Sequence, residues 1–191
     1  MKKLLAALTL FVASFTANGA GLDLALSDET ANLALLFNPG GDAVSNSQIS
    51  LGAMFNDLDD LVFYGTLMAL GASKYEEKYL SLGAGVRIYA GDLDELDHTV
   101  GALAIGGRAG IYVLPHPVNP VDVVLEGFFA PGITSTGDTE KMWEYSARLQ
   151  VEVVRSARAY LGFRQVRVDV DDVGKVDVDD NFHLGISIDF Y

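Results

Sequence analysis

The sequence predicts an all-β fold: a transmembrane, antiparallel, up-and-down β-barrel of about ten strands that follows a cleaved signal peptide. Three observations predict this fold. Segments that alternate apolar with polar residues recur along the chain, with turn residues between them. Beyond the N-terminal segment, no apolar run reaches the roughly 20 residues that a membrane helix needs. The last segment alternates without interruption and ends in aromatic residues. Because only helices and closed barrels pair every backbone group inside a bilayer, a membrane protein with this pattern should be a barrel.

Residues 1–20 have the features of a secretory signal peptide. Lys2 and Lys3 form a basic start, and residues 4–12 form a short apolar segment. Ala17 and Gly19 are small residues separated by one position, as in an A-x-A-like cleavage site. We therefore expect cleavage after Gly19 or Ala20. The remaining residues 21–191 have the length of one domain, which we predict to be an outer-membrane β-barrel.

Ten segments have the two-residue period of β-strands. They cover residues 22–27, 30–38, 47–56, 61–72, 79–90, 100–113, 121–130, 142–154, 158–169 and 181–191. Several approach the length of a tilted membrane strand. The first two are shorter, so a barrel of eight strands in which they pair differently stays open.

The connections predict which end of the barrel faces the periplasm. Those after the fifth, seventh and ninth segments are long and polar, at residues 91–99, 131–141 and 170–180. The connection at residues 155–157 is short, as periplasmic turns usually are. An even number of strands then places both termini in the periplasm of a Gram-negative cell.

Composition excludes some functions and favours the membrane over a soluble location. The formal net charge of −13 argues against nucleic-acid partners, and the absence of cysteine excludes disulfides and thiolate chemistry. None of the six lysines lies well inside a proposed strand, although a water-facing strand surface would normally carry them. The polar faces mix arginines, carboxylates and glycines, which suits a narrow, ion-paired lumen. A soluble, lipocalin-like periplasmic barrel is the alternative.

The last segment also predicts partners. It places apolar side chains on one face and His183, Gly185, Ser187 and Asp189 on the other. His183, Gly185, Ile188 and Phe190 stand at the spacing of the C-terminal assembly signal that this segment resembles, the signal of bacterial outer-membrane barrels. This resemblance implies contact with the barrel assembly machinery during biogenesis, and then with outer-membrane lipid and lipopolysaccharide. The oligomeric state stays open.

Three stretches in the second half of the chain resemble the YfaZ family of outer-membrane proteins. They are FFAP at residues 128–131, WEYSAR at 143–148 and RSARAYLGFR at 155–164. The residues that match the family pattern are Tyr145, Ala147, Gly162, Phe163 and Arg164. The resemblance implies an outer-membrane barrel of a family often described as porins, and it supplies neither a substrate nor catalytic residues.

Charged residues on the polar faces form the candidate lumen network. They are Arg87, Arg108, Asp122, Glu126, Glu144, Arg148, Glu152, Arg158, Arg164 and Asp189. Charges in a low-dielectric wall need a partner or water. Two functions fit: a narrow porin-like pore for small solutes, and a non-conducting structural or surface-interaction barrel with a plugged lumen. Five arginines against five acids favour mutual neutralisation, and barrels of about eight strands are filled by side chains.

Acidic loops and histidines do not predict a metal site or a cofactor. Residues 169–180 match a calcium-loop pattern poorly, because position 5 is Val173 and the final bidentate glutamate is absent. Such loops are typical of solvated hairpin tips, which can bridge to lipopolysaccharide through divalent cations. His98, His116 and His183 are expected at different heights in the barrel, which argues against a shared metal.

The sequence does not predict an enzyme. His98 beside Asp97, with Ser135 in a neighbouring loop, is the only combination that could resemble a rim catalytic site. No G-x-S-x-G nucleophile motif accompanies it. Juxtaposed polar residues of these types occur by chance in loops, so we expect no catalytic residues.

Overall fold

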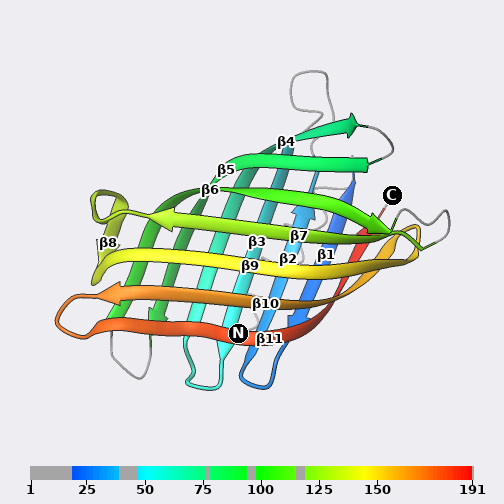
Figure 1. The fold of residues 1–191 in the computed structure, drawn as a ribbon. Helices are drawn as coiled ribbons and strands as arrows, with labels where there is room; N and C mark the ends of the chain where they lie inside the picture. Colours follow the sequence, from blue (N-terminus) through cyan, green and yellow to red (C-terminus); the bar gives the residue numbers. More distant parts are fainter. Residues whose placement is uncertain (1–18, 39–46, 76–77, 94–97, 115–118, 191) are drawn as a thin grey trace.

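The computed structural model describes residues 19–38, 47–75, 78–93, 98–114 and 119–190, which form one antiparallel barrel (Figure 1). Its wall consists of β1 (Ala20–Leu26), β2 (Thr30–Phe37), β3 (Ser47–Asn56), β4 (Leu61–Tyr75), β5 (Lys78–Leu93), β6 (His98–Leu114), β7 (Val121–Ala130), β9 (Thr139–Val154), β10 (Ala157–Val170) and β11 (Gly174–Phe190). Within these ranges, no helical segment has the length and hydropathy of a membrane span.

Pairing between the first and last strands closes the barrel. β1 and β11 run antiparallel from Ala20 opposite Phe190 to Leu26 opposite Leu184. The other wall strands pair with their neighbours in the chain, so the up-and-down order is confirmed and the eight-strand alternative is wrong. A further short strand, β8 (Ser135–Gly137), pairs with β6 outside this ring and follows a 3-10 turn at Gly132–Thr134.

The two ends of the barrel carry different connections. We call the end with Ala20, Phe190 and the 155–156 turn the terminal end. The opposite, distal end carries the turns at residues 27–29, 57–60 and 171–173. In Figure 1, β7, β9, β10 and β11 cross β1 to β3 at a steep angle. Opposite walls cross in this way because the strands of a closed barrel tilt relative to its axis.

Most predicted strands lie within a few residues of the observed ones, and the largest error concerns β11. Residues 170–180 are not a long polar connection, because β11 begins at Gly174 and only residues 171–173 form the turn. Positive φ angles at Asp172 (62°) and Gly174 (93°) reverse the chain there. The acids after the turn alternate with valines at period two, so they belong to a strand whose outer face is charged.

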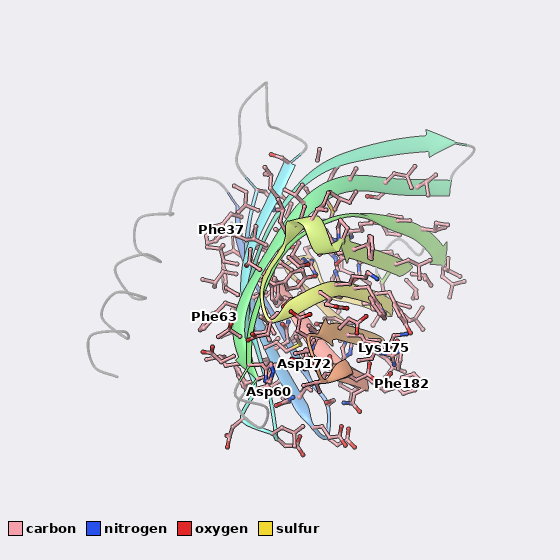
Figure 2. The ribbon with its side chains drawn as sticks, turned by 90° about the vertical axis from the view of Figure 1, so that its left-hand side faces the viewer. Phe37, Asp60, Phe63, Asp172, Lys175 and Phe182 are labelled. Atoms are coloured by element: carbon pink, nitrogen blue, oxygen red, sulfur yellow. The ribbon has the colours of Figure 1, made fainter. Side chains whose placement is uncertain are left out.

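The middle of the barrel has an apolar outer surface. Ile88 on β5, Ile105 on β6 and Leu184 on β11 are 57%, 64% and 67% exposed. Phe63 and Phe182 lie on opposite outer walls in Figure 2. In the described strands, the outward positions of this middle region carry no Asp, Glu, Lys or Arg. The predicted orientation, apolar outside and charged inside, is confirmed for this region.

Inside the barrel, glycines on one strand lie beneath rings on the next. The four cross-strand pairs are Gly52–Tyr64, Gly106–Phe128, Gly162–His183 and Gly185–Tyr160. A Cβ atom added to any of these glycines would lie between 2.1 and 2.6 Å from an atom of the facing ring or, at Gly106, from the neighbouring backbone. The absence of a side chain therefore lets each ring lie flat against the wall and keeps the lumen narrow.

The inner and outer faces of β10 exchange polarity beyond Arg164. On the terminal side, Leu161 and Phe163 face outward while Arg164 faces inward. On the distal side, Arg167 and Asp169 face outward, and three valines with at most 2% exposure face inward (Val166, Val168 and Val170). The terminal part is thus built for an apolar exterior, and the distal part for water outside and a dry interior.

The same exchange occurs on β9 and β11, so the distal lumen is filled by an apolar layer. Lys141 and Lys175 lie on the outer faces, while Met142 and Val178 are buried inside. The distal layer comprises Met54, Val62, Leu93, Val100, Ala102, Ala130, Met142, Val166, Val168, Val170 and Val178. Its members come from opposite walls and are 7% exposed or less. They therefore form an apolar cluster across the distal half of the lumen.

Candidate functional site

The candidate site is the charged lumen below the distal apolar layer, and Arg87 lies at its centre. Its Nη1 is 2.7 Å from Glu144 Oε2, and its Nη2 is 3.4 Å from Glu126 Oε2. Its Nε donates a hydrogen bond of 2.7 Å to Thr66. The guanidinium carbon also lies 4.0 Å from the ring centroid of Phe128. Each nitrogen of the Arg87 guanidinium thus has a polar partner, as a buried charge requires.

Two tyrosines extend this cluster toward the apolar layer. The Tyr89 hydroxyl donates to Glu144 Oε2 at 2.6 Å, and the Tyr64 hydroxyl donates to Asn32 Oδ1 at 2.9 Å. These bonds satisfy the polar tips of rings whose bodies are buried. Glu144 therefore accepts from an arginine and from a tyrosine, and it is tied to β5 from across the lumen.

A second centre forms around Asp23, which the sequence analysis missed. Its Oδ1 accepts a bond of 2.7 Å from the Tyr160 hydroxyl, and its Oδ2 lies 3.4 Å from Arg148 Nη1. The Arg148 guanidinium also lies 5.2 Å from the Tyr160 ring centroid. Asp23 stands on the inward face of β1, between outward Leu22 and Leu24. Its position in the alternating pattern was a signal that could have identified it.

A third centre pairs Arg164 with Asp179, another residue absent from the predicted network. Arg164 Nε lies 2.5 Å from Asp179 Oδ2, and Thr30 donates to Asp179 Oδ1 at 3.0 Å. The pairing register shifts between Val166 and Arg167, so Val178 and Asp179 are both buried on the inner side of β11. Such a bulge breaks the two-residue period, and pattern reasoning alone cannot locate it.

The terminal end of the lumen holds the remaining predicted charges in looser contacts. Arg158 lies 3.4 Å from Asp189, and Gln150 donates to Asp122 at 2.5 Å. Arg108 Nη1 lies 3.7 Å from Glu126 Oε1. Glu152 lies opposite Arg158 in the β9–β10 register, but within the described residues it forms no ion pair.

Nine of the ten predicted lumen residues therefore form ion pairs or hydrogen bonds inside the barrel, and Glu152 lies at the edge of the lumen. The predicted balance of charge changes, because Asp23 and Asp179 bring the acids to seven against five arginines. The described lumen is thus net acidic. The ion pairs of Arg87 and Arg148 join strands that are distant in the sequence.

The residues of the assembly signal occupy both faces of β11. His183 and Gly185 face the lumen, while Ile188 and Phe190 lie on the outer face. His183 is 7% exposed and packs edge-to-face on Tyr160, with ring centroids 5.8 Å apart. Its buried Nδ1 has no hydrogen-bond partner among the described residues. The ring borders a lumen cavity that Arg148 and Arg164 also line.

The lumen cavities are small. Two adjoining cavities of about 70 Å³ each share Asp23, Tyr64, Arg87, Glu126 and Arg148 in their walls. A larger cavity of about 160 Å³ lies at the terminal end. These spaces are wide enough for water, and arginines line each of them.

Other candidate sites receive no support from the geometry. Asp97 and His116 lie outside the described residues, and the Ser135 hydroxyl donates to the Pro131 carbonyl at 3.2 Å. Asp169 and Asp180 lie within β10 and β11 and not in a loop that could wrap a calcium ion. In the described part of the chain, no group of three or more His, Cys, Asp or Glu could hold a metal ion.

Comparisons with known proteins found similar solved structures. Neither protein-family profiles nor characterised proteins gave a match. Among solved structures, a crystal structure of the NanC porin in a rhombohedral form is similar over 91% of this chain and 98% of that chain. The two are 10% identical, with a TM-score of 0.35. We draw nothing further from so distant a likeness, and the barrel follows from the strand pairing of the chain itself.

Proposed function

We propose that this protein is an outer-membrane β-barrel, and one observation carries the proposal: the exchange of inner and outer polarity along β9, β10 and β11. In the middle of the barrel, charges face the lumen and apolar side chains face outward. Because exposed apolar area costs about 25 cal/mol per Å² in water, such an outer surface needs an apolar surrounding. The bilayer supplies it.

The distal exchange marks where the membrane would end. Trp143, Tyr145, Phe163 and Phe182 stand on the outer face at this level, as an interfacial girdle would. Beyond it the outer face becomes charged. A soluble lipocalin-like barrel would keep its apolar face inside along its whole length, which the paired arginines of the middle region contradict. The stretches that resemble the YfaZ family suit the same location.

The proposed orientation places the terminal end in the periplasm and the distal end outside the cell. The described terminal turn at residues 155–156 is short, whereas β8 and the β10–β11 hairpin project at the distal end (Figure 1). Short periplasmic turns and longer extracellular parts are the usual arrangement of such barrels.

Within this location, the geometry supports a non-conducting barrel better than an open pore. The distal apolar layer fills one part of the lumen, and Arg87 with its ion pairs lies between two small cavities in the charged part. A structural or surface-interaction role follows, with the charged interior bracing the wall. The narrow porin-like pore is the second candidate, favoured by the polar cavities of the terminal half. Conduction would require the apolar layer to rehydrate.

Cell fractionation tests the location. We expect the protein in the outer-membrane fraction, with gel migration that changes on heating because the closed barrel resists detergent until it unfolds. Recovery in the soluble periplasmic fraction without detergent would end this proposal.

Planar-bilayer recording tests the closed lumen. The purified barrel should give no stable channel steps. A matched variant, Val168→Ser with Met142→Ser, introduces polar groups into the apolar layer and should raise the frequency of small openings if this layer is the barrier. Large, stable steps from the unaltered protein would refute the closed lumen and favour the porin.

A further inference from the structure

One lumen cavity lies at the terminal end and has the size of a small binding pocket. Its volume is about 160 Å³. A cavity of about 150 Å³ accommodates a ring of six carbon atoms, so this one has room for a ligand of about six heavy atoms. Its walls combine two arginines, a carboxylate, an amide and a hydroxyl with apolar surface: Arg108, Arg158, Asp122, Gln150, Ser81 and Val124.

Arg108 has guanidinium donors to spare. Its contacts within the described residues are made by Nη1 alone, at 3.7 Å from Glu126 and 3.5 Å from Gln48. Arg87 by contrast uses Nε, Nη1 and Nη2, at distances from 2.7 to 3.4 Å. A guanidinium carries five N–H donors in a fork that matches a carboxylate. Arg108 is therefore poised to take an anionic group, whereas Arg87 is part of the framework.

The other polar groups of the pocket define the rest of the ligand. The contact between Arg158 and Asp189 is long, at 3.4 Å, and the Arg158 side chain is 35% exposed. Arg158 can therefore turn toward an incoming anion. Asp122 lines the cavity, and its Oδ2 accepts a hydrogen bond from Gln150, which leaves Oδ1 as a further acceptor. An acceptor close to two arginines suits a ligand with a donor a few bonds from its anionic group.

We propose that this pocket binds a small carboxylate that also carries a hydroxyl or an ammonium group. Arg108 binds the carboxylate, Arg158 strengthens that contact, and Asp122 accepts from the second group. The pocket lies below the closed part of the lumen, so a ligand enters and leaves at the terminal end. Binding does not depend on conduction, and only the side of entry rests on the proposed orientation.

Saturation-transfer NMR on the folded barrel in lipid nanodiscs tests the pocket. The probes are lactate and alanine, with acetate, glycerol and inorganic phosphate for comparison. We expect saturable binding of lactate or alanine that is tighter than that of acetate and glycerol. Arg108→Gln should weaken this binding at least about tenfold, because it removes a charge-assisted contact. Asp122→Asn should reduce the preference for alanine over acetate.

Arg167→Gln is the matched control, since Arg167 is an arginine on the outer surface of the same barrel. It should bind the probes as the unaltered protein does. Heat-modifiable migration of every sample shows whether the barrel is folded, so a failure to bind is separated from a failure of the proposed fold and location. Equal affinities in the unaltered protein and Arg108→Gln would overturn the proposal. So would an absence of saturable binding up to about 50 mM, or phosphate binding as tight as that of lactate.

Discussion

At the scale of single residues, the lumen combines fixed and adaptable charges. Arg87 contacts two carboxylates and lies between the rings of Phe128 and Tyr64, at 4.0 and 5.0 Å from their centroids. Arg108 at the terminal end has only long contacts. Burial explains the difference, because an arginine 6% exposed must find its partners in the protein, whereas one nearer the mouth can use water.

Replacement of Arg87 by leucine should therefore destabilise the barrel strongly. Glu126 and Glu144 would lose their shared cation, and breaking a buried pair costs about 3–5 kcal/mol. Urea unfolding in lipid vesicles, followed by the fluorescence of Trp143, measures the free energy of unfolding. Arg167→Gln on the water-facing surface should leave the unfolding midpoint unchanged. Equal effects of the two substitutions would contradict the framework role of Arg87.

The glycines beneath rings make a second prediction at this scale. A Cβ at Gly185 would lie 2.1 Å from Tyr160 Cζ, so Gly185→Ala must displace the ring that holds Asp23. We expect a loss of about 1–3 kcal/mol, as overpacking typically costs. Gly110→Ala is the control, because the nearest atom to its added Cβ is 3.7 Å away. If Gly110→Ala destabilises as much, an added methyl group at any lumen glycine has this effect, and displacement of the Tyr160 ring is not the cause.

At the scale of elements, period two explains what the sequence could predict. β3 and β7 match their predicted bounds because each alternates through its full length. Residues 174–180 were misassigned because acidic composition outweighed an alternation that begins only after the turn. Asp179 could not be placed, since the β10–β11 bulge shifts the parity of the strand. The distal apolar layer was missed for a related reason. An alternating sequence distinguishes the two faces of a strand, but it does not show which face is in contact with water.

The exchange of faces on β10 makes a prediction for this element. Leu161→Arg would place a charge on the outer face within the apolar band, and a charge at the bilayer midplane costs about 2–4 kcal/mol. Asp169→Arg changes charge on the same face beyond the exchange and should cost little. Refolding yield into vesicles, read from the heat-modifiable band, compares the two. If both variants refold alike, the band does not end near Phe163.

At the scale of the whole molecule, the outer surface of one closed wall is apolar in the middle region and charged in the distal region. The middle region inverts the usual arrangement of a soluble protein, with charge inside and apolar surface outside, while the distal region restores it. The apolar layer then resembles the core of a small soluble barrel placed on top of a membrane barrel. This stacking gives a lumen that is closed on the distal side and polar on the terminal side, which places any binding function at the terminal mouth.

The absence of native cysteine allows a direct test of this orientation. Asp171→Cys places a thiol in the distal β10–β11 turn, and Arg155→Cys places one in the terminal β9–β10 turn. Both positions are exposed, so accessibility depends only on which side of the membrane they occupy. A membrane-impermeant maleimide should label Asp171→Cys in intact cells and Arg155→Cys only after the outer membrane is permeabilised. The reverse pattern would place the termini outside the cell, and the polar pocket would then open to the medium.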